Sequence, residues 1–244
     1  MNFVLVHGAW LGAWCWEEVA EQLRSQGHQV AVPELPGHGN DSTPLSQISL
    51  DAYVKKVTEA ISAPAVLVGH SMAGIVISQT AESSSKKVQQ LIYVAAYLLR
   101  DGENITNISQ LADDSLVPAN MVFAPDYSTV EIRQEGLRDV FCADASADHA
   151  KALAQKARPE PTAPFNAPVQ LSAGRFGEIS RSYIRTTQDR AVTPKLQSLM
   201  LERTPCDIVL SIDSSHTPFL SRPAELAELI GYASTRMRER AEGA

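Results

Sequence analysis

A serine stands at the centre of the stretch whose residue types and spacing are best suited to chemistry. The apolar run at 66–68 ends in the segment GHSMAG at 69–74, and a helical pattern follows at once. This layout is typical of a nucleophile elbow, in which a tight turn between a strand and a helix holds a serine hydroxyl clear of the sheet. Small residues at 69 and 73 leave room for the strained backbone of such a turn. We therefore interpret Ser71 as a nucleophile; the alternative is a solvent-facing serine in an ordinary turn.

A serine hydroxyl attacks only when a base removes its proton and a third group orients that base. Of the six histidines, His216 alone follows the last predicted strand, at the sheet edge where Ser71 is expected. His7 and His70 flank tight loops, where an imidazole ring more often braces the backbone. The pattern therefore favours His216 as the base over the remaining histidines, which are His28, His38 and His149.

Four aspartates compete for the role of the orienting acid. Asp189 follows a predicted strand and so lies at the carboxyl edge of the sheet. Asp213 is close in sequence to His216, but it would have to fold back to reach the ring. Asp207 begins a strand, at the wrong edge, and Asp101 follows an earlier strand. The order serine, aspartate, histidine along the chain favours Asp189, with the other three as alternatives.

A reaction that passes through a tetrahedral intermediate also needs two N–H donors aimed at one point. Met72 supplies one of them, because its N–H opens the helix that follows the serine. The loop after the first strand begins with small residues, which let its backbone approach a ligand closely. We expect the second donor to be the N–H of Ala9, with the N–H of Trp10 as the alternative.

The elements that must position these residues alternate between apolar strands and amphipathic helices. Strands without a polar face, separated by helices, predict an α/β fold with a mostly parallel central sheet flanked by helices. Ligands bind such sheets beyond the carboxyl ends of the strands. We predict strands at 3–6, 30–32, 66–68, 88–98, 181–186 and 207–212, and helices at 16–26, 50–61, 73–82, 194–203 and 223–232.

The alternation of strands and helices stops after residue 100 and resumes at about residue 180. The intervening chain is polar and rich in proline, with helical patterns near 129–142 and 147–157 and no clear strand. Because long excursions of this kind usually carry function, we predict a helical cap at 101–179 over a core at 1–100 and 180–244. A decorating surface insertion is the alternative. The side chains expected to line a pocket are Trp10, Met121, Phe123, Tyr127, Phe141 and Phe219.

The composition excludes several classes of partner. A net charge of −7 over 244 residues argues against nucleic acid and against an anionic membrane surface. Three scattered cysteines predict neither a disulfide framework nor a metal site, and they fit a reducing compartment. With no leader and no apolar span in view, we expect a cytoplasmic protein that acts on a small molecule without a metal or organic cofactor. The sequence does not decide between a monomer and a homodimer.

These motifs resemble those of the α/β-hydrolase superfamily over nearly the whole chain outside the cap. More narrowly, the segment VHGAWLGAWCW at 6–16 is similar to that of a cofactor-free group containing plant methylesterases, plant hydroxynitrile lyases and bacterial esterases such as pyrethroid hydrolases. The resemblance implies Ser71 as nucleophile, His216 as base and Asp189 as orienting acid. It also implies that the N–H groups of Ala9 and Met72 bind the oxyanion.

Two positions separate this chain from the lyases of that group. The lyases carry a threonine directly after the histidine of the first loop and a lysine directly after the catalytic histidine, where this chain has Gly8 and Thr217. A lyase needs a cation to stabilise departing cyanide. We therefore expect hydrolysis of small, mostly apolar carboxylic esters through an acyl-enzyme. The alternatives are a small-molecule binding protein of the same fold with residual hydrolysis, and a hydroxynitrile lyase.

Overall fold

Six parallel strands form the central sheet of the computed structural model, which describes residues 1–242. Their order, β2-β1-β3-β4-β8-β9, reverses between β1 and β3, so the chain leaves these two neighbours in opposite directions. The carboxyl ends at such a switch point form a crevice where ligands bind. The strands are β1 (Asn2–Val6), β2 (Gln29–Ala31), β3 (Ala65–His70), β4 (Val88–Val94), β8 (Arg181–Thr186) and β9 (Ile208–Ile212).

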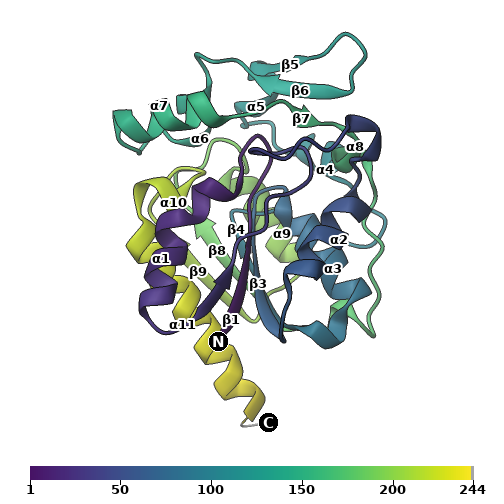
Figure 1. The fold of residues 1–244 in the computed structure, drawn as a ribbon, viewed down its shortest axis with the longest axis vertical. Coiled ribbons are helices and arrows are strands. Elements are labelled where there is room, and N and C mark those ends of the chain that lie inside the picture. Colours follow the sequence, from purple (N-terminus) through teal and green to yellow (C-terminus); the bar gives the residue numbers. More distant parts are fainter. Residues whose placement is uncertain (243–244) are drawn as a thin grey trace.

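Helices cover both faces of this sheet. On one face α1 (Glu17–Ser25) packs against α11 (Pro223–Glu242), and on the other α2 (Leu50–Ala60) packs against α3 (Ala73–Ser83) (Figure 1). Two further helices, α9 (Pro194–Arg203) and α10 (Pro218–Ser221), lie in the C-terminal half of the chain. The α/β fold predicted from the sequence, with a parallel sheet covered on both faces, is therefore confirmed.

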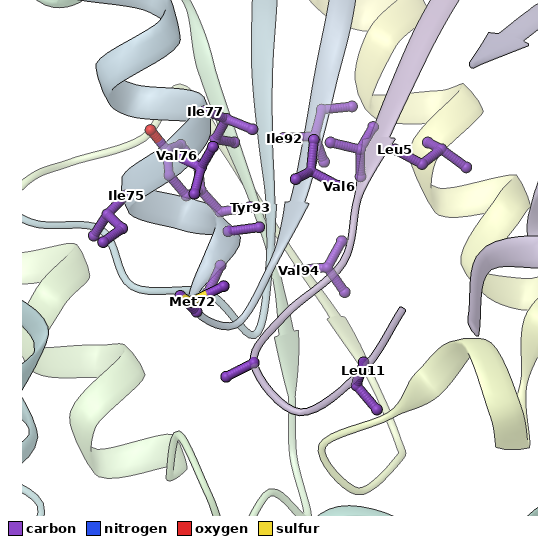
Figure 2. Close-up of a cluster of buried hydrophobic side chains, with 14 of the residues drawn as sticks. Leu5, Val6, Leu11, Met72, Ile75, Val76, Ile77, Ile92, Tyr93 and Val94 are labelled. Carbon is purple, nitrogen blue, oxygen red and sulfur yellow. The ribbon is translucent and has the colours of Figure 1, made fainter. Parts of the chain in front are cut away.

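The core beneath the switch point is a continuous apolar layer. Side chains of β1, β4 and α3, among them Val6, Ile92 and Ile77, point toward one another in Figure 2, and each is fully buried. Burying an aliphatic side chain of this size stabilises the folded state by about 1.5–3 kcal/mol. The packing holds the ends of β1 and β3 at fixed positions relative to each other.

The segment between β4 and β8 contains residues 101–179, which we call the cap. Most of the cap lies over the carboxyl end of the sheet, and its last part runs down beside α3, where Ser172 N and Phe176 N donate to Glu82 (Figure 1). It is not only helical, because it contains a three-stranded antiparallel sheet of β5 (Met121–Phe123), β6 (Thr129–Ile132) and β7 (Glu160–Pro161). The helix predicted at 129–142 is wrong over 129–132, since these residues form β6. The cap helices are α4 (Ile105–Ser109), α5 (Val117–Asn120), α6 (Leu137–Phe141), α7 (Ala147–Lys156) and α8 (Ala163–Asn166).

Within residues 1–242, no helix combines the length and the apolar character that crossing a membrane requires.

Candidate active site

Ser71 lies at the apex of a tight turn between β3 and α3. Its φ of 54° is in the left-handed region, which residues other than glycine rarely adopt. Two backbone hydrogen bonds fix the turn: Tyr97 N donates to Ser71 O over 3.0 Å, and Ser71 N donates to Val94 O over 3.3 Å. Strain of this kind costs about 1–3 kcal/mol and is concentrated at functional sites. The segment at 69–74 thus has the strand–turn–helix geometry of a nucleophile elbow.

The loop after β1 approaches this turn closely because Gly8 has no side chain. A Cβ atom built on Gly8 would lie 2.8 Å from Ser71 Cβ and 2.8 Å from His70 Nδ1, well inside contact distance. Any larger residue would push the loop away from the turn. The absence of a side chain at Gly8 therefore lets the backbone that follows, including Ala9, lie beside the serine.

A buried carboxylate orients the ring of His216. Asp189 Oδ2 lies 2.7 Å from His216 Nδ1, and both side chains are almost completely buried. The other oxygen, Oδ1, accepts hydrogen bonds from Ala191 N over 2.7 Å and Val192 N over 3.0 Å, which fix the carboxylate. Since Nδ1–H points at Asp189, the lone pair of the neutral ring is on Nε2. Among the described residues, that nitrogen has no hydrogen-bond partner.

The other aspartates considered from the sequence lie away from His216. Asp213 is exposed and accepts hydrogen bonds from Thr187 Oγ1 and Gln188 Nε2, both over 2.8 Å. Asp207 accepts from Arg181 N, at the opposite end of β8, and Asp101 accepts from Leu171 N in the cap. The structure therefore brings Asp189, and none of the three alternatives, to the histidine ring.

Two further histidines brace the backbone around the site. His70 Nε2 donates to the carbonyl of His216 over 2.8 Å. Burial, together with the nearby His216 ring, lowers the pKa of His70 well below its usual range. His7 Nε2 accepts a hydrogen bond from Leu35 N over 3.1 Å, and burial lowers the pKa of His7 as well. Both rings are neutral at pH 7 and hold loops in place.

A cavity of about 300 Å³ lies between the cap and the carboxyl ends of the strands, and Ser71 and His216 both line it. Its wall is mostly apolar, and it contains no aspartate, glutamate, lysine or arginine among the described residues. The rest of the wall consists of Ala9, Trp10, Met72, Tyr97, Ile105, Thr106, Ser109, Gln110, Ala112, Ser115, Val117, Pro118, Met121, Phe123, Phe141, Thr162, Phe165, Asn166, Ala191 and Val192.

Of the side chains expected to line the pocket, Trp10, Met121, Phe123 and Phe141 do so. The expectation is wrong for the other two, and for different reasons. Phe219 is fully buried behind the site, with its ring centroid 4.8 Å from that of His70. Tyr127 lies on the outer surface of the cap and is 69% exposed. The sequence did not point to Tyr97, Ile105 or Val192. Tyr97 and Val192 lie in irregular loops after β4 and β8, and Ile105 lies in the cap, so no periodicity marks them as lining residues.

Two backbone N–H groups at the cavity are free to bind an oxyanion. Those of Ala9 and Met72 donate to no residue that the structure describes, and both residues line the cavity. The N–H of Trp10, the alternative donor from the sequence, is wrong for this role. It donates instead to Glu160 Oε2 over 2.9 Å.

Glu160 is a residue at this site that sequence reasoning missed. Besides Trp10, it contacts His38, whose Nε2 lies 2.7 Å from Glu160 Oε2, and both side chains are fully buried. Burial disfavours the charged imidazolium, but Glu160 outweighs this effect and raises the pKa of His38. Nothing in the sequence signals these contacts, because Glu160 is 122 residues from His38 and 150 from Trp10.

Within residues 1–242, no group of three or more histidine, cysteine, aspartate or glutamate side chains is placed to hold a metal ion. All three cysteines are free thiols, so the chain has no disulfide.

Comparisons with known proteins identify the same fold, and each of them covers most of this chain. The sequence pattern of the alpha/beta hydrolase family matches residues 3–229. Putative methylesterase 13, chloroplastic, from Arabidopsis thaliana is 32% identical over 249 residues, which cover 94% of this chain. The chain spans only 55% of the length of that relative.

Two bacterial proteins are similar over nearly their whole lengths. Pyrethroid hydrolase from Sphingobium wenxiniae is 30% identical over 245 residues, covering 94% of this chain and 86% of that protein. The crystal structure of a pyrethroid hydrolase from Sphingobium faniae matches with a TM-score of 0.84 at 28% identity, over 95% of this chain and 96% of that one.

Proposed function

The chain belongs to the alpha/beta hydrolase family, and we propose that it is a serine-dependent esterase that cleaves small, uncharged carboxylic esters. One observation carries the proposal. A strained serine, a carboxylate-oriented histidine and two unpaired backbone N–H groups meet in one apolar cavity. This is the set of groups that acyl transfer through a tetrahedral intermediate requires.

In the proposed reaction Ser71 Oγ attacks the ester carbonyl carbon while His216 Nε2 takes the hydroxyl proton. The carbonyl oxygen becomes an oxyanion between the N–H groups of Ala9 and Met72. When the tetrahedral intermediate collapses, the C–O bond to the alcohol breaks and His216 gives its proton to the leaving oxygen. Water, deprotonated by the same histidine, then attacks the acyl-enzyme ester. When this second tetrahedral intermediate collapses, the bond to Ser71 Oγ breaks, His216 returns the proton to Oγ, and the carboxylic acid leaves. Asp189 keeps Nδ1–H in place and stabilises the imidazolium in both steps.

The apolar wall of the cavity supports an uncharged substrate. A carboxylate or ammonium group on the substrate would lose its hydration without gaining an ion pair there. The names of the methylesterase and pyrethroid hydrolase relatives point to the same reaction class. A cavity of about 300 Å³ is at the small end of the range for ligand sites, which fits a substrate of modest size.

The residue after His216, which is Thr217, does not support the hydroxynitrile lyase alternative. Thr217 Oγ1 donates to the carbonyl of Phe141 over 2.9 Å, so this hydroxyl fastens the cap rather than facing a leaving group. The cavity wall offers no cation for cyanide. A binding protein with residual hydrolysis would have the same arrangement of Ser71, His216 and Asp189 as an esterase, and it would differ from an esterase in its slow turnover.

The test is hydrolysis of a short-chain p-nitrophenyl ester by the wild type and by Ser71→Ala. We expect steady multiple turnover by the wild type and a loss of about 10⁴-fold or more in kcat for the variant, as when the nucleophile of a triad is removed. Equal rates for the two proteins would overturn the proposal. A single turnover followed by tight retention of the product would favour the binding protein.

A further inference from the structure

Every hydrogen-bonding group of Trp10 is bound by the cap. Its backbone N–H donates to Glu160 Oε2 over 2.9 Å, and its indole Nε1–H donates to Val130 O over 2.9 Å. Its carbonyl accepts from Arg158 N over 3.0 Å. Trp10 belongs to the core by sequence and directly follows Ala9, the proposed oxyanion donor in the loop after β1. The cap therefore holds one end of the loop that binds the oxyanion.

The backbone of Trp10 needs such support because its φ is 61°, in the left-handed region that a bulky residue avoids. A residue in this conformation persists only when surrounding contacts impose it. The bond from Trp10 N to Glu160 fixes the peptide plane between Ala9 and Trp10. Without it, the Ala9–Trp10 peptide can rotate toward ordinary backbone angles, although the bonds to the carbonyl and the indole of Trp10 remain. The neighbouring Gly8–Ala9 peptide, which carries the N–H of Ala9, then shifts with it.

Glu160 is itself held rigidly in a fully buried position. The same oxygen that accepts from Trp10 N lies 2.7 Å from His38 Nε2, and the other oxygen lies 3.5 Å from the hydroxyl of Tyr53. His38 Nδ1 contacts the carbonyl of Pro36 over 3.1 Å, so both ring nitrogens face acceptors. This arrangement favours the imidazolium, in line with the raised pKa of His38. A buried carboxylate paired in this way is an acceptor at a fixed position. If it moved, it would lose hydrogen bonds that no water replaces in the interior, and this is costly.

We propose that Glu160, a cap residue, is a positioning residue for the oxyanion hole, because it fixes the left-handed backbone of Trp10 and thereby aims the N–H of Ala9. The inference rests on the proposed esterase function and adds a role for the cap beyond enclosing the substrate. A role limited to fastening the cap predicts lost stability alone. Positioning predicts a specific loss of transition-state binding.

Three substitutions separate these roles. Glu160→Met fills the same volume but offers Trp10 N no acceptor. Glu160→Gln keeps an oxygen acceptor for Trp10 N without the charge. Glu160→Asp keeps a carboxylate for His38 but is one methylene shorter, so it withdraws the acceptor from Trp10 N. This variant replaces Glu160→Met in the test if Glu160→Met does not fold. Gln79→Ala is the matched control, since it removes two hydrogen bonds between α3 and the cap at Gln170, away from Trp10.

The measurements are kcat and KM for a short-chain p-nitrophenyl ester, the inhibition constant of a trifluoromethyl ketone, which forms a tetrahedral oxyanion on the serine, and thermal unfolding. We expect Glu160→Met and Glu160→Asp to lower kcat by about 10- to 100-fold, with a smaller change in KM. This loss is smaller than the roughly 10²- to 10³-fold cost of a missing oxyanion donor, because the N–H of Ala9 is misaligned rather than removed. The inhibition constant of the trifluoromethyl ketone should rise by a similar factor in both variants. Glu160→Gln should recover most of both losses, and Gln79→Ala should lower only the unfolding temperature.

Other results would overturn the inference. One is a folded Glu160→Met or Glu160→Asp protein with wild-type kcat and wild-type ketone affinity. Another is a Glu160→Gln protein as impaired as Glu160→Met, since that would assign the effect to the charge rather than to the acceptor for Trp10. If the wild type turns over esters through Ser71 while these variants match it, only the positioning role fails. A wild type without esterase activity would overturn both proposals.

Discussion

Single hydrogen bonds decide which groups at this site are available for chemistry. The N–H of Trp10 is already bound to Glu160, whereas the N–H groups of Ala9 and Met72 have no partner among the described residues. In the same way Asp189 is the carboxylate that reaches His216. The sequence could place the serine, the histidine and this aspartate, because the carboxyl ends of parallel strands meet at one edge. It could not show Glu160, since no periodicity or spacing relates a cap residue to Trp10.

Asp189 and Asp213 offer a matched pair for testing the acid. We expect Asp189→Asn to lower kcat by about 10³- to 10⁴-fold, because an amide in this position favours the wrong tautomer of His216. Asp213→Asn should leave kcat within about twofold, since the Asp213 side chain is exposed and its hydrogen bonds in the described part of the chain go to Thr187 and Gln188. Steady-state kinetics of the two purified proteins measure this difference. A similar loss in both variants, or none in Asp189→Asn, would contradict the assignment.

The elements of the core were predictable from the sequence, and those of the cap were not. Strands such as β3 are buried along their whole length, and their continuous apolar runs mark them clearly. The cap strands have two to four residues and mixed exposure, so neither a helical nor a strand period stands out. The pattern at 129–142 joined strand β6 and helix α6 into one predicted helix. Elements this short take their form from the tertiary contacts around them.

The approach of α3 to the end of β4 depends on one position in the elbow helix. A Cβ atom on Gly74 would lie 2.1 Å from the carbonyl oxygen of Tyr97, a contact with backbone that cannot rotate away. We expect Gly74→Ala to lower the free energy of unfolding by about 1–3 kcal/mol, as overpacking does. It should lower kcat as well, because Tyr97 N also fixes the turn at Ser71. Urea unfolding and steady-state kinetics measure the two effects.

Gly174→Ala is the control for this prediction. Nothing lies within 4 Å of a Cβ atom at Gly174, and its φ is not in the left-handed region. The substitution should change the free energy of unfolding by less than about 0.5 kcal/mol and leave kcat unchanged. Equal stability of the two alanine variants would show that α3 does not need the close approach.

At the scale of the whole molecule, the cap and the sheet build the site together. The sheet supplies Ser71, His216 and Asp189 from its carboxyl edge, and the cap supplies most of the apolar wall. The cap also supplies Glu160, which holds the loop after β1. The cavity therefore exists only where the two parts meet, which fits a reaction that needs water excluded and the substrate enclosed. The chain order of the core predicts the candidate reacting groups, while most of the cavity wall around them comes from the cap.

The most direct test of this account is to identify the residue that carries the acyl group. The purified protein is mixed with p-nitrophenyl acetate, quenched in acid within the first turnovers, digested and examined by mass spectrometry. We predict one acetyl group on the peptide that contains Ser71, and none on that peptide in Ser71→Ala. Ester hydrolysis at the wild-type rate with no acyl group on Ser71, or with the group on another residue, would contradict the account.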